Sequence, residues 1–118
     1  MATKEINIDY MTCPIRQVIS RFGDKWSLLV LYTLGESETG TLRFSEIKRN
    51  MTDCSQKMLS ITLKNLEQSH LLTRKVYPEV PPRVEYSLTD TGRSLIPLLS
   101  SLIGWAKEHF EDVTKQLV

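Results

Sequence analysis

Three leucines in the middle of the chain, Leu59, Leu63 and Leu66, recur in steps of four and three residues. At about 100° per residue this spacing places them in one narrow stripe along a helix, and such a stripe must face a core. From Leu71 onward apolar and polar residues alternate instead, which is typical of β-strands. The chain must therefore place a helix with one buried side directly before a β-hairpin.

The other side of the same helix carries side chains suited to nucleic acid. Ser55 can cap the helix, which we expect to run to about residue 69. A shorter helix over residues 46–50, capped by Ser45, precedes a break at residues 51–53. Two helices joined by a tight turn describe a helix-turn-helix, in which the outer face of the second helix would read bases. That face holds Gln56 at the first turn and, opposite the leucines, Lys57, Ser60, Ile61, Lys64 and Gln68.

Two further helices are predicted before this motif. Pro14 suits the first position of a helix that we expect to run to about residue 21. Asp24 is a good N-cap for a second helix over residues 25–34, and Gly35 is a stop signal after it. Polar residues 36–40 predict a surface loop that leads into the short stretch at residues 41–44. On the buried side of the second helix we expect Trp26, Leu29, Val30 and Leu34.

Two alternating segments, residues 73–77 and 83–88, predict the strands of a hairpin. Residues 78–82 between them are too rich in proline for a strand and suit a stiff tip. A hairpin directly after a recognition helix is a wing, so the predicted fold class is mainly α with a small β-hairpin wing, a winged helix-turn-helix. One face of the second strand holds Val84, Tyr86 and Leu88, and the other holds Arg83, Glu85 and Ser87.

A final helix, capped by Thr89, is expected from residue 90 to beyond residue 113. It is apolar around most of its circumference, and a small wing motif cannot cover so wide an apolar surface. A second copy of the chain is the expected cover, which predicts a homodimer. One stripe of this helix holds Leu95, Leu99, Leu102, Ala106 and Phe110, and further apolar residues are Ile96, Leu98, Ile103 and Trp105.

Length and charge agree with one DNA-binding domain. With 118 residues and 41% hydrophobic content, a single domain over residues 1–118 is expected. The net charge is only +1, but residues 41–75 carry seven basic side chains and three acidic ones. The segments before and after carry four basic against five acidic and four against six. A confined positive excess favours one face turned toward a polyanion, and a solvated basic face without a partner is the alternative.

Several other classes of protein find no support in the sequence. Residues 1–12 lack the apolar stretch of a secretory signal or a membrane span, so a cytoplasmic protein with reduced Cys13 and Cys54 is expected. No His/Cys spacing resembles a zinc site, and no Gly-rich phosphate loop or catalytic motif is present. We therefore expect no metal, no other cofactor and no enzymatic activity. His70 and His109 are expected to be surface or helix-capping residues.

Six stretches, in order along the chain, carry a family resemblance: Cys13–Ile15, Phe22–Trp26 (FGDKW), Leu42–Ile47 (LRFSEI), Leu63–Glu67 (LKNLE), Val76–Tyr86 (VYPEVPPRVEY) and Leu88–Gly92 (LTDTG). Over roughly residues 13–111 the chain resembles the HxlR-type family of bacterial winged helix-turn-helix regulators, within the MarR-like superfamily. The resemblance implies sequence-specific DNA binding as a dimer that pairs through its first and last helices. Two departures are Cys54, where the family usually has an aliphatic residue, and a slightly longer loop at residues 35–41.

We expect double-stranded DNA as the partner, held by three groups of residues. The recognition helix would enter the major groove, where Gln56 can pair with adenine and lysines can reach guanine acceptors or phosphates. Arg83 on the wing is the candidate for a minor-groove contact. The alternative for each residue is a solvated surface side chain. The candidate DNA-binding residues are Arg43, Lys48 and Arg49, which we expect on the backbone, and Ser55, Gln56, Lys57, Ser60, Lys64 and Arg83.

Two more sets of residues complete the expectations. Cys13 precedes Pro14 at a helix N-terminus, where a thiolate is stabilised. The matching cysteine senses oxidants or electrophiles in several HxlR-type relatives, so Cys13 is a candidate redox sensor with a small electrophile or oxidant as signal; the alternative is an inert thiol kept for packing. The expected dimer interface comprises Ile15, Val18, Leu99, Leu102, Ile103, Trp105, Ala106 and Phe110.

Two other functions were weighed against a DNA-binding regulator. One is a winged-helix module that binds another protein and has lost operator binding, against which Lys57, Lys64 and Arg83 argue. The other is a thiol enzyme, for which no second residue is placed to activate or resolve Cys13.

Overall fold

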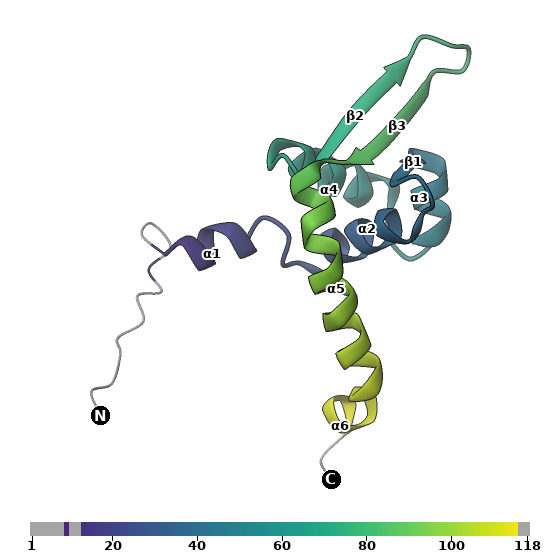
Figure 1. Cartoon of the computed structure of the whole chain (residues 1–118). Helices are drawn as coiled ribbons and strands as arrows, with labels where there is room; N and C mark the ends of the chain where they lie inside the picture. The colour runs from purple at the N-terminus through teal and green to yellow at the C-terminus, as the bar shows by residue number, and fades with distance from the viewer. Residues whose placement is uncertain (1–8, 10–12, 116–118) are drawn as a thin grey trace.

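The computed structural model describes residue 9 and residues 13–115, so residues 1–12, where an export signal would lie, are almost wholly outside the described part. The described chain is mainly helical with one small antiparallel sheet, and it has the predicted winged helix-turn-helix architecture (Figure 1). In chain order its elements are α1 (Pro14–Ile19), α2 (Lys25–Glu36), β1 (Thr41–Arg43), α3 (Phe44–Asn50), α4 (Gln56–Gln68), β2 (Leu72–Tyr77), β3 (Arg83–Leu88), α5 (Asp90–Glu108) and α6 (Phe110–Thr114).

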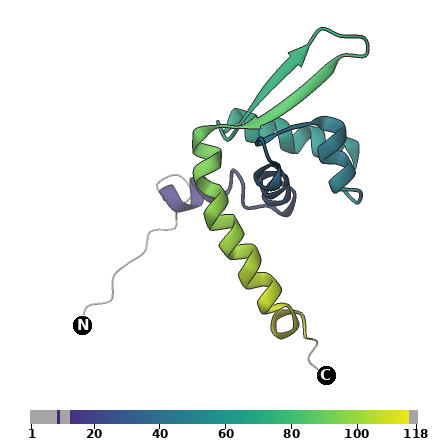
Figure 2. The same ribbon diagram turned by 45° about the vertical axis from the view of Figure 1, so that its right-hand side comes forward.

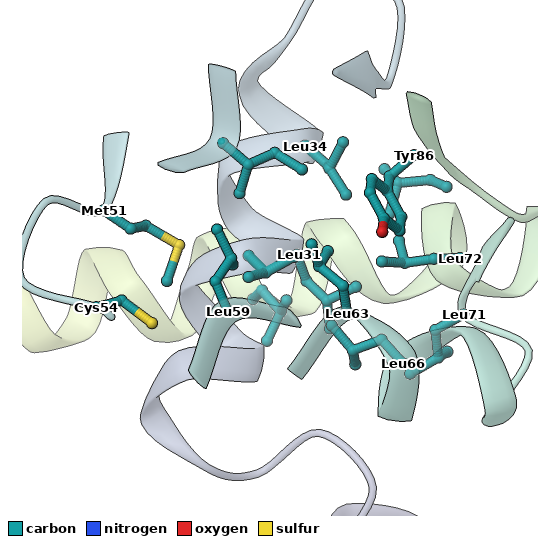
Figure 3. Packing of buried hydrophobic residues seen from close by; sticks show 14 residues of the cluster. Leu31, Leu34, Met51, Cys54, Leu59, Leu63, Leu66, Leu71, Leu72 and Tyr86 are labelled. Carbon is teal, nitrogen blue, oxygen red and sulfur yellow. The ribbon is translucent and has the colours of Figure 1, made fainter. Parts of the chain in front are cut away.

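The core is built around α4. Leu59, Leu63 and Leu66 are fully buried, as their spacing predicts. They pack with Leu31 and Leu34 of α2 and with apolar residues of α3, the sheet and the first half of α5 (Figure 3). This packing fixes α4 rotationally, because a turn about its axis would exchange leucines for lysines in the core.

The wing is a hairpin of β2 and β3, to which β1 adds a third strand in the order β1-β3-β2. Leu72 pairs with Leu88 at the base of the hairpin and Tyr77 with Arg83 near its tip. β1 pairs with β3 from Thr41 opposite Ser87, where the two side-chain hydroxyls lie 2.7 Å apart. A three-residue strand is too short for a period to show, and for this reason the sequence predicted only a short stretch here.

The predicted caps are present at three helices. Ser55 Oγ accepts a hydrogen bond from the Met58 amide (3.0 Å), and Thr89 Oγ1 accepts one from the Gly92 amide (3.0 Å). Asp24 caps α2 in the same way through the Ser27 amide (3.1 Å). These bonds satisfy amide groups that have no partner within their own helix, and they fix where each helix begins.

Helix α2 corrects two predictions. It runs through Gly35 to Glu36. Glycine at position 35 makes room for α5, because a Cβ there would lie 2.7 Å from Ile96 Cγ2. Glycine therefore serves helix contact here and does not end the helix. Leu29 is 42% exposed, whereas Leu31 is fully buried. The buried positions are residues 27, 30, 31 and 34, the spacing that one helical face requires.

Two other boundaries differ from the prediction. Helix α3 begins at Phe44, with Ser45 inside its first turn, because the Glu46 carboxylate accepts a hydrogen bond from the Arg43 amide (2.9 Å) and caps the helix. The expected long final helix ends at Glu108 as α5 and resumes at Phe110 as α6. In both cases a local hydrogen bond or turn sets the boundary, which composition alone did not reveal.

The wing and the end of α5 point in opposite directions from the body formed by α2, α3 and α4 (Figures 1 and 2). Figure 1 shows α1 to one side of that body. Within the described residues no helix is both long and apolar enough to cross a bilayer.

We predict that Leu63→Ala lowers the free energy of unfolding by about 2–5 kcal/mol, because it opens a cavity beside fully buried neighbours. The adjacent exposed substitution Lys64→Ala should change it by no more than about 0.5 kcal/mol. Urea unfolding of both variants at one protein concentration checks this. Equal losses would mean that the leucine face of α4 is not the anchored one.

Candidate nucleic-acid interface

The structure brings the predicted recognition residues together on the exposed side of α4. The leucine stripe turns inward, and the side chains on the opposite side face solvent. Ile61 and Met58 lie among them and are partly exposed, so this face is not wholly polar. The exposed predicted residues on this helix are Gln56, Lys57, Ser60 and Lys64.

Ser55 lies at the beginning of this face with its side chain already engaged. Its Oγ is the cap that accepts from the Met58 amide, so its first role is to set the start and direction of α4. It remains exposed at the helix end that carries the positive end of the helix dipole. That end suits an anionic partner such as a phosphate.

The three residues predicted to contact the DNA backbone lie on or next to α3, and they differ in how far they are exposed. Arg43 and Arg49 are exposed at the two ends of the helix. Lys48 is half-buried, and its Nζ makes a long contact (3.5 Å) with the Thr52 carbonyl in the turn before α4. Lys48 also lies close enough to Cys54 to act on its ionisation, so part of its role is within the protein.

Arg83 does not extend freely from the wing as the sequence suggested. Its guanidinium lies over the ring of Tyr77, 4.0 Å from the ring centroid, and one of its nitrogens lies 3.4 Å from a Glu79 carboxylate oxygen. Lys75 Nζ lies 4.9 Å from the same ring. Sequence reasoning missed Tyr77, Glu79 and Lys75 here. Alternation places Lys75 and Tyr77 on one strand face, but only the register places Arg83 opposite Tyr77.

A cleft of about 520 Å³ separates the wing tip from the beginning of α3. Arg43, Phe44 and Ser45 line one side of it, and residues 79–84 of the wing line the other. Arg43 and Arg83 therefore border one concave surface. In both views the wing and α4 lie toward the end of the molecule that is opposite to α6 (Figures 1 and 2).

The candidate dimer residues divide into two groups. Ile15 and Val18 of α1, and Leu102, Trp105, Ala106 and Phe110 of α5 and α6, are exposed, while Ile103 is half-buried. Leu99 is a correction: it is only 3% exposed and belongs to the core of its own protomer, because the first half of α5 packs on α2. Sequence reasoning had no way to find where along α5 the body ends.

The exposed apolar surface is wider than the predicted set. Ile19 on α1, Leu98 on α5 and Val113 on α6 are also more than half exposed. At Trp105 the indole stacks on the His109 ring, with centroids 4.6 Å apart, and still leaves 52% of the residue exposed.

The two cysteines occupy different settings. Cys13 is the N-cap residue of α1, is 3% exposed, and donates its backbone amide to the Asp9 carbonyl (2.7 Å). Cys54 lies beside Met51 in the core (Figure 3). Burial raises the pKa of the Cys54 thiol, and the nearby positive charge of Lys48 only partly opposes this. A buried thiol that stays protonated is a poor nucleophile, so Cys54 packs as an apolar residue.

Among residues 9 and 13–115, no group of three or more His, Cys, Asp or Glu side chains is placed to hold a metal ion. His70 follows α4 in the left-handed conformation (φ 62°), and His109 is the C-cap of α5, so both are helix-end residues as expected.

The chain matches the family model described as HxlR-like helix-turn-helix over residues 21–114. It is 50% identical over 101 residues to an HTH-type transcriptional regulator of Methanothermobacter thermautotrophicus (strain Delta H), covering 86% of this chain and 75% of the relative. It is 39% identical over 110 residues to the HTH-type transcriptional regulator YtfH of Escherichia coli (strain K12), covering 93% and 85%.

Solved structures show the same similarity. The structure described as the transcriptional regulator ytfH from Salmonella typhimurium superposes with a TM-score of 0.78 at 38% identity, over 92% of this chain and 95% of that one. The redox regulator HypR in its reduced form superposes with a TM-score of 0.77 at 32% identity, over 87% and 99%. The oxidised form of HypR gives a TM-score of 0.72.

Proposed function

The chain belongs to the HxlR-like helix-turn-helix family of transcriptional regulators, and we propose that it is a single-domain regulator that binds specific sequences of double-stranded DNA as a homodimer. One observation carries the proposal: the leucine side of α4 is buried, and the lysine and glutamine side of this helix, which leads directly into the wing, is left exposed. A helix presented in this way fits a major groove about 12 Å wide.

In this proposal the contacts divide by role. Gln56, Lys57, Ser60 and Lys64 meet base edges and phosphates in the major groove, beginning at the Ser55 cap. Arg43, Lys48 and Arg49 hold the backbone beside it. Arg83 contacts the duplex near the minor groove, where the negative potential is concentrated. The confined positive charge of residues 41–75 supports this arrangement, since affinity for DNA depends mostly on phosphate neutralisation.

The dimer is supported by the exposed apolar surface. A monomer rarely leaves a large apolar patch in water, yet α1, the outer half of α5 and α6 expose Ile15, Val18, Leu102, Trp105 and Phe110. Their burial against the same residues of a second copy, together with Ile103 and Ala106, gives a two-fold particle. Two recognition helices in such a particle meet half-sites one turn, about 34–36 Å, apart.

We further propose that oxidation or alkylation of Cys13 weakens DNA binding. Cys13 caps α1, an element that the proposed dimer uses, so an adduct there would change how the protomers pair. The similarity to HypR, described as a redox regulator in both oxidised and reduced forms, supports this idea. Because Cys13 is 3% exposed, the reaction requires α1 to move.

For DNA binding, we predict that Lys64→Ala weakens binding to a duplex that the wild type selects from a random-sequence library by about 5- to 150-fold, since one base contact is worth about 1–3 kcal/mol. The slope of log K against log salt concentration should become shallower by about 0.9 if the lysine neutralises a phosphate. Lys115→Ala, at an equally exposed lysine beyond α6, is the matched control. Equal effects of both variants, or no selection of any duplex, would refute the proposal and favour a protein-binding module.

For the dimer, we predict that Trp105→Asp yields folded monomers in sedimentation velocity, because it places a charge in the apolar contact. Val80→Asp adds the same charge at the fully exposed wing tip and should leave the dimer intact. A wild-type chain that sediments as a monomer, or a Trp105→Asp variant that remains dimeric, contradicts this assembly.

For the thiol, we predict that hypochlorite or benzoquinone modifies Cys13, detected by mass spectrometry, and weakens DNA binding in parallel. Cys54 should stay unmodified until the protein unfolds, because it is buried and its raised pKa keeps it protonated. Cys13→Ser should bind DNA and lose the response, while Cys54→Ser should keep it. DNA binding unchanged in treated wild type with Cys13 intact would eliminate the switch.

A further inference from the structure

Near the tip of the wing, two side chains, Tyr77 and Glu79, contact the guanidinium of Arg83. Tyr77 ends β2 and Arg83 begins β3, and the two residues are paired across the hairpin. The guanidinium of Arg83 lies 4.0 Å from the Tyr77 ring centroid, and one nitrogen lies 3.4 Å from Glu79 Oε1. The Glu79 amide donates to the Tyr77 carbonyl (2.8 Å), a bond that fixes the start of the tip turn and holds the carboxylate beside the arginine.

The Arg83 guanidinium is held in place, but among the described residues not all of its N–H groups have a hydrogen-bond partner. Its Nε is buried and has no hydrogen-bond partner within the described part of the chain. A single oxygen at 3.4 Å does not use the two-pronged geometry that arginine makes with carboxylate or phosphate. The side chains of Arg83 and Glu79 are 28% and 52% exposed, so water reaches the pair and its mutual attraction is weak. A stronger anion can therefore displace Glu79.

The geometry points to a role for Glu79 that deepens the proposed function and rests on it: Glu79 is an internal competitor of DNA for Arg83. In the free protein the Glu79 carboxylate pairs with the Arg83 guanidinium. In the complex, phosphate oxygens that border the minor groove take the place of this carboxylate. Glu79 is thus a positioning residue that acts through Arg83. It lowers the affinity for every duplex. The specific contacts of α4 therefore have to contribute more of the free energy of binding.

The opposite role makes the opposite prediction. If the ion pair held Arg83 ready for DNA, its removal would weaken binding, since the arginine would lose its order. The contact with the Tyr77 ring argues against this positive role of the ion pair. The ring orders the Arg83 guanidinium by a cation–π contact, which leaves the positive charge available to an anion.

The salt dependence of binding distinguishes competition from a structural role. When DNA displaces Glu79, a counterion released from the phosphate is offset by the cation that the freed carboxylate attracts. Without the carboxylate that offset disappears, and each complex releases more ions on balance. The slope of log K against log salt concentration should then steepen, by at most about 0.9, the value for one fully neutralised phosphate. A change in wing rigidity alone would not alter the number of ions released.

The test measures binding of full-length Glu79→Gln to the duplex selected by the wild type, from low to high salt. We expect binding about 1.4- to 5-fold tighter, the range for an exposed ion pair, and the steeper slope. Glu111→Gln on α6 makes the same charge change at the other end of the molecule and should alter neither. In an Arg83→Ala background, Glu79→Gln should also have no effect, and thermal unfolding shows that all variants are folded.

Unchanged or weaker binding by Glu79→Gln, or an equal gain in the Arg83→Ala background, overturns the competitor role. Lys64→Ala separates this failure from failure of the proposed function. If Lys64→Ala weakens binding and Glu79→Gln does nothing, DNA binding through α4 stands and only the role of Glu79 falls. If the wild type selects no duplex, both fall together.

Discussion

The packing of three leucines on α4 against α2 and the sheet is the interaction on which the rest of the structure depends. Because Leu59, Leu63 and Leu66 are fully buried, the rotation of α4 is fixed and its polar side must face outward. The same helix ends at Gln68, and the chain turns at His70, in the left-handed conformation, directly into the base of the wing. The direction of the hairpin beside α4 thus follows from how this one helix is anchored. The same anchoring leaves Lys57 and Lys64 exposed to solvent.

Features with a strong local signal could be predicted from the sequence. The leucine period of α4, the caps Ser55 and Thr89, and the alternation of β2 and β3 each set their element without help from distant residues. Features decided by contacts between distant segments could not. Gly35 reads as a stop signal, but it lies inside α2, where its missing Cβ makes room for Ile96 of α5. Leu99 reads as part of an uninterrupted apolar stripe, yet the body of the protomer covers it. The surroundings of Arg83 depend on hairpin register, which alternation does not specify.

The described part of the chain leaves two surfaces exposed to solvent, and these surfaces differ in chemistry. At one end α4, the start of α3 and the wing expose basic and polar groups around a concave surface. At the other, the outer half of α5 exposes apolar side chains, with further ones on α1. Exposed charge is stable in water, whereas exposed apolar surface favours association. The proposed contact with DNA and the proposed pairing with a second copy would therefore use opposite ends of the chain, as a two-fold DNA-binding particle requires.

The central claim is that the outer face of α4 contacts the duplex. Lysine acetylation footprinting, with and without a duplex selected by the protein, tests it most directly because the modification of each lysine is measured separately. The account predicts strong protection of Lys57 and Lys64 by the duplex, with Lys107 and Lys115 equally reactive in both states. Protection confined to Lys107 and Lys115, with Lys57 and Lys64 unchanged, would contradict it.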